Sequence, residues 1–351
     1  MKTITVNTSN NYKIIIDKNI LSTAGDIAAK EIGVSRCAVI TDSNVDKLYS
    51  STLIASLESA GYKVTKFVFE AGEQSKNANT FIDILEFLAS CELTRSDCIF
   101  ALGGGVVGDI AGFAASVYLR GIKYVQIPTT LLAMVDSSVG GKTGIDLNSG
   151  KNLAGAFHQP SLVICDTSLL NTLTTEVFAD GCAEVIKYGI INDTDLISLI
   201  NSGIRKNIDE IVESCVNNKR LIVEKDEFDN GCRQLLNLGH TVGHAIEKCS
   251  EFNISHGSAV AIGMVVMMTA AVNSDLCDEY ALEELIKILK ENNLPTECNY
   301  TAKQLASVAL SDKKRKGNTI TLAIPYNVSD TRLVDISVDE LEAFIERGLD
   351  R

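Results

Sequence analysis

Three of the four histidines in this 351-residue chain lie close together in the sequence. His240 and His244 are four residues apart, which would place both on one face of a helix, and His256 follows soon after. Such imidazoles suit a divalent metal, and a catalytic zinc ion takes three protein ligands and leaves one position open. Spacing alone selects His240 and His244 as the pair, with Glu184 on an apolar segment as a carboxylate candidate. The alternative is that these are hydrogen-bonded core histidines.

A glycine-rich turn follows the strand-like run Asp97–Leu102. Gly103, Gly105 and Gly108 satisfy the spacing G-x-G-x-x-G, and an apolar helical pattern comes next. Glycines let the backbone approach a pyrophosphate, and the N-terminus of the following helix offers free N–H groups to the anion. The spacing indicates a dinucleotide site, although a plain strand-to-helix turn explains it too.

The acidic partner that binds a dinucleotide ribose normally lies about 20 residues beyond the glycines. Here that region is Tyr124–Thr130, which holds no Asp or Glu. Asp42 and Asn44, directly after an earlier strand-like run, are the better candidates, and Glu73 and Lys76 follow the next one. We therefore expect a dinucleotide site whose parts come in an unusual order.

Two lysines stand in glycine-rich surroundings and suggest an anion site. Lys142 and Lys151 are both preceded by glycine, and Asn152 follows the second. A P-loop is excluded because no glycine lies five residues before Gly141, where that motif requires one. The lysines are interpreted either as anion ligands or as solvated surface residues.

Composition excludes several classes of function. The net charge of −13 argues against nucleic acid or an anionic membrane as partner, but allows a small anionic ligand in a local basic pocket. The ten cysteines are scattered without any C-x-x-C pair, which favours a reducing compartment. The longest apolar stretch, Ala259–Val272, is too short to span a bilayer, and the first residues lack the apolar core of a signal peptide. We expect a soluble cytoplasmic protein.

The two halves of the chain differ in pattern. Strand-like runs alternate with helical patterns in the first half, at Tyr12–Ile16, Arg36–Ile40, Ser50–Ala60 (helical), Lys63–Phe69, Ala78–Ser90 (helical), Asp97–Leu102 and Lys123–Ile127. Long helical patterns dominate the second half, followed by a short β-like pair: Glu176–Ile191, Leu196–Glu224, Cys232–Cys249, Ala259–Ser274, Leu282–Asn292, then Thr319–Ile324 and Asp330–Asp335.

These patterns predict two domains. Residues 1–175 should form an α/β, Rossmann-like domain with a parallel sheet that binds the nucleotide. Residues 176–351 should form a mainly α-helical domain that binds metal and substrate. We expect the active site in the cleft between them.

The motifs taken together closely resemble the 3-dehydroquinate synthase family, from about Asp42 to Lys314. The resemblance rests on an ordered set of motifs: GGGVVGD, YLRG, IPTTLLAMVDSSVGGKTGID, GKNLAGAFHQP, AEVIKYG, LNLGHTVGHAIE and SHG. It implies conversion of 3-deoxy-D-arabino-heptulosonate 7-phosphate to 3-dehydroquinate and phosphate. The implied steps are oxidation by NAD, phosphate elimination, reduction, ring opening and intramolecular aldol closure, in the shikimate pathway.

The resemblance also implies site residues. The metal, Zn²⁺ or Co²⁺, falls to Glu184, His240 and His256, and His244 then faces the substrate. The NAD-binding positions would be Asp42, Asn44, Glu73, Lys76, Gly103, Gly104, Gly105, Val106, Val107, Gly108, Asp109, Thr129, Thr130, Lys142, Lys151, Leu169, Leu170, Asn171 and Thr172. The catalytic and substrate-contacting positions would be Arg120, Asp136, Lys142, Lys151, Asn152, Lys187, Lys219, Arg233, Asn237, His244 and either Lys313 or Lys314.

The family further implies a homodimer in which Arg120 reaches the substrate phosphate of the neighbouring subunit. One departure is Asp229, where the family often has Glu. Two other classes stay open: a polyol dehydrogenase or another sugar phosphate cyclase with NAD and metal, and a non-catalytic protein with structural zinc. The last class normally uses several cysteines at ligand spacing, and none of the ten is so placed.

Overall fold

The protein is described from a computed structural model, which covers residues 1–310, 315–316 and 318–350. Lys313 and Lys314 lie outside the described residues. Cα proximity divides the chain into two compact units: Met1–Leu173 with Lys219–Glu224, and Thr174–Asn218 with Lys225–Arg351. Among the described residues no helix has both the length and the apolar character that crossing a membrane requires.

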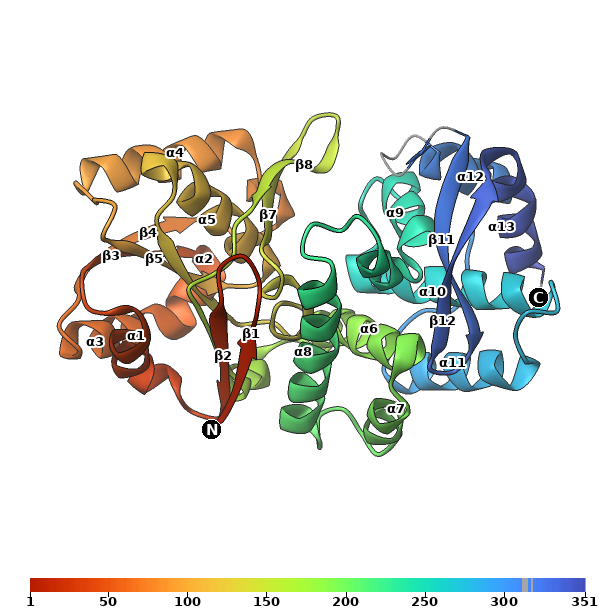
Figure 1. The fold of residues 1–351 in the computed structure, drawn as a ribbon, viewed down its shortest axis with the longest axis horizontal. Coiled ribbons are helices and arrows are strands. Elements are labelled where there is room, and N and C mark those ends of the chain that lie inside the picture. Colours follow the sequence, from red (N-terminus) through yellow and green to blue (C-terminus); the bar gives the residue numbers. More distant parts are fainter. Residues whose placement is uncertain (311–314, 317, 351) are drawn as a thin grey trace. The chain divides into compact units, whose positions relative to one another are not determined.

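The first unit is built on a seven-stranded sheet, which Figure 1 shows with helices along it. In spatial order the strands are β1 (Lys2–Val6), β2 (Tyr12–Asp17), β9 (Leu162–Asp166), β6 (Lys123–Pro128), β5 (Cys98–Gly103), β3 (Arg36–Asp42) and β4 (Lys63–Phe69). All neighbouring pairs are parallel except β1 with β2. The predicted parallel sheet is confirmed, whereas β9 was not foreseen.

Successive residues of a strand point to opposite faces of the sheet, and both faces of this sheet are apolar. Helices therefore cover each face. α4 (Ala78–Ser90) and α5 (Gly105–Val117) pack on one face, where Ile40 and Ala101 lie. α1 (Ala24–Ile32) and α3 (Ser51–Ser59) lie on the other side of the sheet in Figure 1. A separate antiparallel hairpin follows the glycine-rich segment and packs against α5: β7 (Lys142–Leu147) and β8 (Gly150–Phe157).

The second unit is mainly helical. Its helices are α6 (Thr175–Asn192), α7 (Thr194–Asn201), α8 (Ile208–Lys225), α9 (His240–Cys249), α10 (His256–Val272), α11 (Glu279–Glu291), α12 (Ala302–Ala309) and α13 (Leu341–Leu349). Within α8, Lys219–Glu224 belong to the first unit. A small antiparallel sheet completes it: β10 (Arg315–Lys316), β11 (Thr319–Asn327) and β12 (Asp330–Ser337). The predicted helical half and its late β pair are confirmed.

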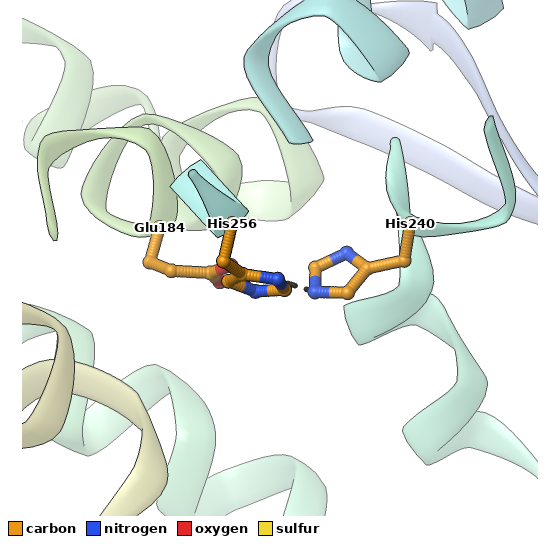
Figure 2. Close-up of side chains that lie close together, drawn as sticks. All are labelled: Glu184, His240 and His256. Atoms are coloured by element: carbon orange, nitrogen blue, oxygen red, sulfur yellow. Dashed lines mark ion pairs between the residues drawn. The ribbon is translucent and has the colours of Figure 1, made fainter. Parts of the chain in front are cut away.

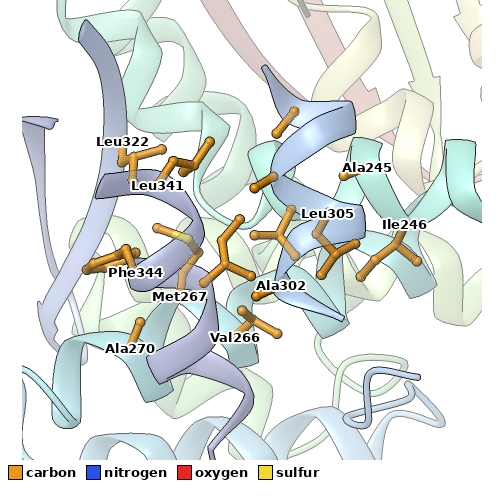
Figure 3. Packing of buried hydrophobic residues seen from close by; sticks show 14 of the residues in the cluster. Ala245, Ile246, Val266, Met267, Ala270, Ala302, Leu305, Leu322, Leu341 and Phe344 are labelled. Atoms are coloured by element: carbon orange, nitrogen blue, oxygen red, sulfur yellow. The ribbon is translucent and has the colours of Figure 1, made fainter. Parts of the chain in front are cut away.

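α10 is the centre of this unit. It is apolar around its whole circumference and buried from Ala259 to Ala271, as expected for a helix surrounded by others. Figure 3 shows Val266 and Met267 of α10 among side chains from α9, α12, α13 and β11, such as Leu305 and Phe344. The apolar stretch that was too short for a membrane is thus a buried core helix.

Two long predicted helices are wrong as single elements. Leu196–Glu224 is interrupted between α7 and α8, where Gly203 has a φ of +110°. Cys232–Cys249 is a 3₁₀ turn, Cys232–Asn237, followed by α9. Gly239 lies between them with a φ of +76°, in the left-handed region that a glycine adopts readily.

Candidate metal and cofactor sites

Glu184, His240 and His256 come together in the second unit, as Figure 2 shows. Glu184 Oε1 lies 3.4 Å from His240 Nε2 and 3.3 Å from His256 Nε2. The three side chains come from α6 and from the first residues of α9 and α10. The two imidazoles therefore point the same kind of nitrogen at one carboxylate.

Glycines bring the three helices close enough for this meeting. A Cβ at Gly263 in α10 would lie 2.0 Å from the carbonyl oxygen of Gly239, directly before α9. A Cβ at Gly257 would lie 2.1 Å from the carbonyl oxygen of Asp180 in α6. The Asp180 carboxylate also accepts the backbone N–H of Gly257 at 2.7 Å, which ties the first turn of α10 to α6.

The second nitrogen of each imidazole has its own partner. His240 Nδ1 lies 3.0 Å from the carbonyl oxygen of Leu238, and His256 Nδ1 lies 3.3 Å from Glu247 Oε2. A carbonyl or carboxylate on the outer nitrogen is the usual arrangement behind metal-binding histidines, because it fixes the tautomer and the ring orientation.

Charge is concentrated around the buried Glu184. Burial opposes its ionised form, but Lys187, which forms an ion pair with it, and His240 hold its pKa well below the usual range. Burial lowers the pKa of His240 to about 4, although Glu184 opposes this. For His256 burial also disfavours protonation, but hydrogen bonds to Glu184 and Glu247 outweigh it and raise its pKa to about 10.

The donor set fits a divalent cation. Both oxygens of Glu184 are buried, and their neighbours are the Lys187 ammonium group, which forms an ion pair with Oε2, and the Nε2 atoms of His240 and His256 beside Oε1. One buried carboxylate that faces two Nε2 atoms matches a three-ligand catalytic zinc site. His244 lies in a second group, with Glu247 and His256, so the spacing-based pair His240 and His244 meets in neither group.

The glycine turn of the first unit lies where the strand order reverses. From β3 the chain goes outward to β4, then returns to β5 on the other side of β3. Parallel α/β sheets bind ligands beyond the carboxyl ends of strands at such a point. Gly103 ends β5 and Asp42 ends β3, and the neighbouring residues Thr41 and Leu102 pair directly. The two predicted halves of the dinucleotide site thus share one edge of the sheet.

Gly103 and Gly105 in the turn differ in what an added Cβ would contact. A Cβ at Gly103 would lie 2.4 Å from the Val107 side chain, so the turn itself requires glycine. At Gly105, the first residue of α5, the nearest atom would be Ser137 Oγ at 3.3 Å. Gly105 thus opens α5, and a helix N-terminus is the end at which an anion is stabilised.

Asp42 lies at the end of β3 and also stabilises the turn that follows. Its carboxylate accepts the backbone N–H groups of Asn44 and Val45 at 2.9 and 3.0 Å and so caps the turn after β3. Thr172, another predicted position, contacts the Tyr49 hydroxyl, which also donates to the Leu169 carbonyl at 3.0 Å. Tyr49 escaped the sequence analysis because nothing in its local pattern marks it.

Lys76 joins two parts of the predicted site. Its ammonium group donates to Asp109 Oδ2 at 2.6 Å and to Asn152 Oδ1 at 2.7 Å, and the side chain is buried. Burial raises the pKa of Asp109, and the nearby Lys76 opposes that shift. Asp146, which sequence reasoning missed, accepts the backbone N–H of Asn152 at 2.7 Å. Lys151 lies 3.9 Å from Glu73, so the glycine-rich hairpin is tied to the cofactor-side residues.

The other predicted residues are placed as follows. Asp136 forms an ion pair with Lys219 in the first unit, although Lys219 belongs to α8. Arg233 is buried in the second unit and donates to the carbonyl oxygen of Glu227. Lys142 is the first residue of β7, and the other positions of the glycine turn lie at or in the first turn of α5: Gly104, Val106, Val107 and Gly108. The remaining positions lie in β6 and the segments around it, in η6 (Thr167–Thr172) or in the Cys232–Asn237 turn: Arg120, Thr129, Thr130, Leu170, Asn171 and Asn237.

Together these features define a class. A doubly wound sheet with a glycine turn at its switch point, combined with a helical unit holding a Glu-His-His group, is the architecture of the dehydroquinate synthase-like fold. The chain has a TM-score of 0.87 and 23% identity to a 2-deoxy-scyllo-inosose synthase, with 99% and 100% of the two chains covered. For the 2-epi-5-epi-valiolone synthase ValA of Streptomyces hygroscopicus the TM-score is 0.89 at 24% identity, with 99% of each chain covered.

Sequence comparison narrows the class to a family. The models for the 3-dehydroquinate synthase N-terminal and C-terminal regions match residues 66–180 and 181–315. The chain is 40% identical over 343 residues to a 3-dehydroquinate synthase of Clostridium acetobutylicum, with 96% of each covered. It is 42% identical over 344 residues to that of Streptococcus gordonii, with 96% and 97% covered. The chain belongs to the 3-dehydroquinate synthase family.

Proposed function

We propose that this chain is a carbon–oxygen lyase that converts 3-deoxy-D-arabino-heptulosonate 7-phosphate to 3-dehydroquinate and phosphate, with NAD and a divalent metal. The observation that carries the proposal is about 40% identity across nearly the whole length to proteins of that name. The meeting of Glu184, His240 and His256 supports it, because the family's metal ligands fall on these three residues.

The cofactors are supported by the two units separately. One related fold was solved with carbaglucose-6-phosphate, NAD⁺ and Co²⁺, and another with NAD⁺ and Zn²⁺. Glu184, His240 and His256 would hold the metal, which as a Lewis acid supplies polarisation of a substrate oxygen. Asp42 and the Gly103–Gly105 turn would hold NAD, which accepts and returns hydride at one carbon.

The residues of the chain itself would mainly bind and orient. A substrate with a phosphate and a carboxylate would explain why an acidic protein buries the cations of Lys187, Lys219 and Arg233. Lys187 keeps Glu184 ionised beside the metal position. Lys76 holds Asn152 in place for hydrogen bonding. Prepositioned charges of this kind lower the barrier without being consumed.

The test measures phosphate release from the heptulosonate phosphate by the purified protein. Release should require NAD and stop when a chelator removes the metal. NAD should work far below the substrate concentration and without net NADH absorbance, because the same carbon is oxidised and reduced again. Steady production of one NADH for each substrate would instead assign the chain to the polyol dehydrogenases, which include glycerol dehydrogenases of similar fold (TM-score 0.66, 16% identity).

We further propose that the enzyme is a cytoplasmic homodimer in which Arg120 serves the neighbouring subunit. Leu119 and Arg120 both have positive φ angles, 50° and 69°, an uncommon conformation for residues other than glycine, in the turn that leads into β6. Val117 and Leu119 expose apolar surface beside Arg120. The ten free cysteines fit a reducing compartment.

A further inference from the structure

Glu247 is a buried carboxylate that the family's ligand set does not include. It lies in α9, three residues after His244, and its side chain is only 4% exposed. Its Oε2 atom is 3.3 Å from His256 Nδ1, whereas His256 Nε2 faces Glu184. The imidazole of His256 is therefore held between two carboxylates, one on each nitrogen.

We propose that Glu247 is a positioning residue for the metal ligand His256, an inference that rests on the proposed metal site. By accepting the Nδ1–H, Glu247 fixes the tautomer in which the Nε2 lone pair is directed at the metal. It also restrains rotation of the ring, because Glu247 projects from a different helix than His256. Outer partners of this kind typically contribute about 10- to 100-fold to metal affinity.

The Nδ1 atoms of the two imidazoles have different partners, and this difference distinguishes the role of Glu247. His240 is backed by the neutral carbonyl oxygen of Leu238, two residues away in sequence. His256 is backed by a buried carboxylate, which costs free energy to bury and makes the opposite ring nitrogen a stronger donor. A carboxylate at this depth is better explained by the ligand that it orients than by packing.

A competing explanation makes Glu247 a direct ligand. His244, Glu247 and His256 each offer a ligand atom within 4.8 Å of the others, so they could hold an ion of their own. In that case His256 Nδ1 would bind metal instead of donating to Glu247. The two explanations predict different numbers of bound ions.

The experiment titrates the metal-free full-length protein with Co²⁺ and with Zn²⁺ against a chromophoric chelator. Wild type should bind one equivalent. Glu247→Ala should bind one equivalent about 10- to 100-fold more weakly, and the isosteric Glu247→Gln should be weakened less. The visible spectrum of bound Co²⁺ should change in both variants, because the ring of His256 is less fixed. Glu283→Gln removes the same charge at an exposed position of α11 and should match wild type.

Thermal unfolding of the metal-free variants separates positioning from a purely structural role. A variant that loses thermal stability but keeps wild-type affinity and Co²⁺ spectrum would overturn the proposal and leave the metal site intact. If Glu247→Ala does not fold, Glu247→Gln decides. Two equivalents in wild type and one in the Glu247 variants would make Glu247 a direct ligand and also overturn it. Failure of wild type to bind any metal would remove the metal site itself, and with it this inference.

Discussion

The two units build their candidate sites from different materials. In the first unit the candidate dinucleotide site consists mainly of backbone: a glycine turn, a helix N-terminus and the capped turn after β3. In the second unit side chains form the candidate metal site, with Glu184, His240 and His256 projecting from three helices. A backbone site tolerates many side chains but no added bulk, whereas a side-chain site tolerates no change in its ligands.

This difference also explains what each site shows in the sequence. A backbone site is local, because its glycines follow one another within a single turn. A side-chain site is assembled by packing, so its members lie far apart in the chain and their spacing carries little information. Variants that change one site should therefore leave the other site intact, and measuring both sites in the same variant tests this.

The largest effect is expected from the metal ligands. Replacing Glu184 by Gln, or His240 or His256 by Ala, should reduce bound metal to background and abolish phosphate release, since a three-ligand site does not survive the loss of one ligand. NAD binding by the first unit should be retained. Elemental analysis and isothermal titration with NAD measure the two.

His244→Ala is the matched control within the same cluster. It should keep its metal and lose turnover, because His244 is assigned to the substrate. If His244→Ala lost the metal while His256→Ala kept it, the spacing-based pair would be right and the set with Glu184 and His256 wrong.

The next largest effect concerns the packing that assembles the side-chain site. Gly257→Ala would place a Cβ 2.1 Å from the carbonyl oxygen of Asp180, so α10 must move away from α6. We expect a loss of about 2–4 kcal/mol in the free energy of unfolding, as for strong overpacking. Metal affinity should fall with it, because His256 is the first residue of α10. Denaturant unfolding and metal titration check this. Wild-type metal affinity in a folded Gly257→Ala protein would contradict it.

A smaller and more selective effect is expected at the backbone site. Gly105→Ala requires only a small shift of the Ser137 side chain, whose Oγ would lie 3.3 Å from the new Cβ, but it adds bulk where the pyrophosphate would lie. NAD should bind about 10- to 100-fold more weakly, equivalent to about 1.4–2.7 kcal/mol. Unfolding and metal content should stay as in wild type. Gly103→Ala is the contrasting variant: its Cβ clashes with Val107, so it should lose stability as well.

The sequence predicted the first unit better than the second. Strands such as Arg36–Ile40 and Lys63–Phe69 are short runs rich in β-branched and aromatic residues or buried apolar residues, and the turn at Gly103 is recognisable from consecutive glycines. The breaks at Gly203 and Gly239 were missed because a single glycine inside a helical pattern does not by itself mark a break. Gly239 directly precedes α9 as its N-cap, with a positive φ and in close contact with Met264. The hairpin β7–β8 was missed because its glycine-rich strands lack apolar alternation.

The site residues follow the same division. Asp42 was found because it follows a strand directly. Spacing could not place Glu184 with His256, because helix packing alone brings them together, and that set came from the resemblance to the family. Tyr49, Asp146 and Glu247 act through contacts to residues distant in sequence or to backbone atoms, which no local pattern reveals. The binding roles assigned to all these positions stay predictions until the variants are measured.

The smallest effect is expected from variants of Arg120. This residue also tests whether a site needs a second copy of the chain. A guanidinium can bind phosphate with two parallel hydrogen bonds, so Arg120→Lys should raise the KM for substrate even though charge is kept.

To learn which subunit Arg120 serves, Arg120→Ala is mixed with His256→Ala under conditions of demonstrated subunit exchange. If Arg120 acts across the interface, each mixed dimer has one site with an intact metal and an intact arginine. Random exchange then restores up to roughly a quarter of wild-type activity, because half of the dimers are mixed and each has one working site. Mixtures no more active than the separate variants would mean that Arg120 serves its own subunit or none, and both sites would then be complete within one chain.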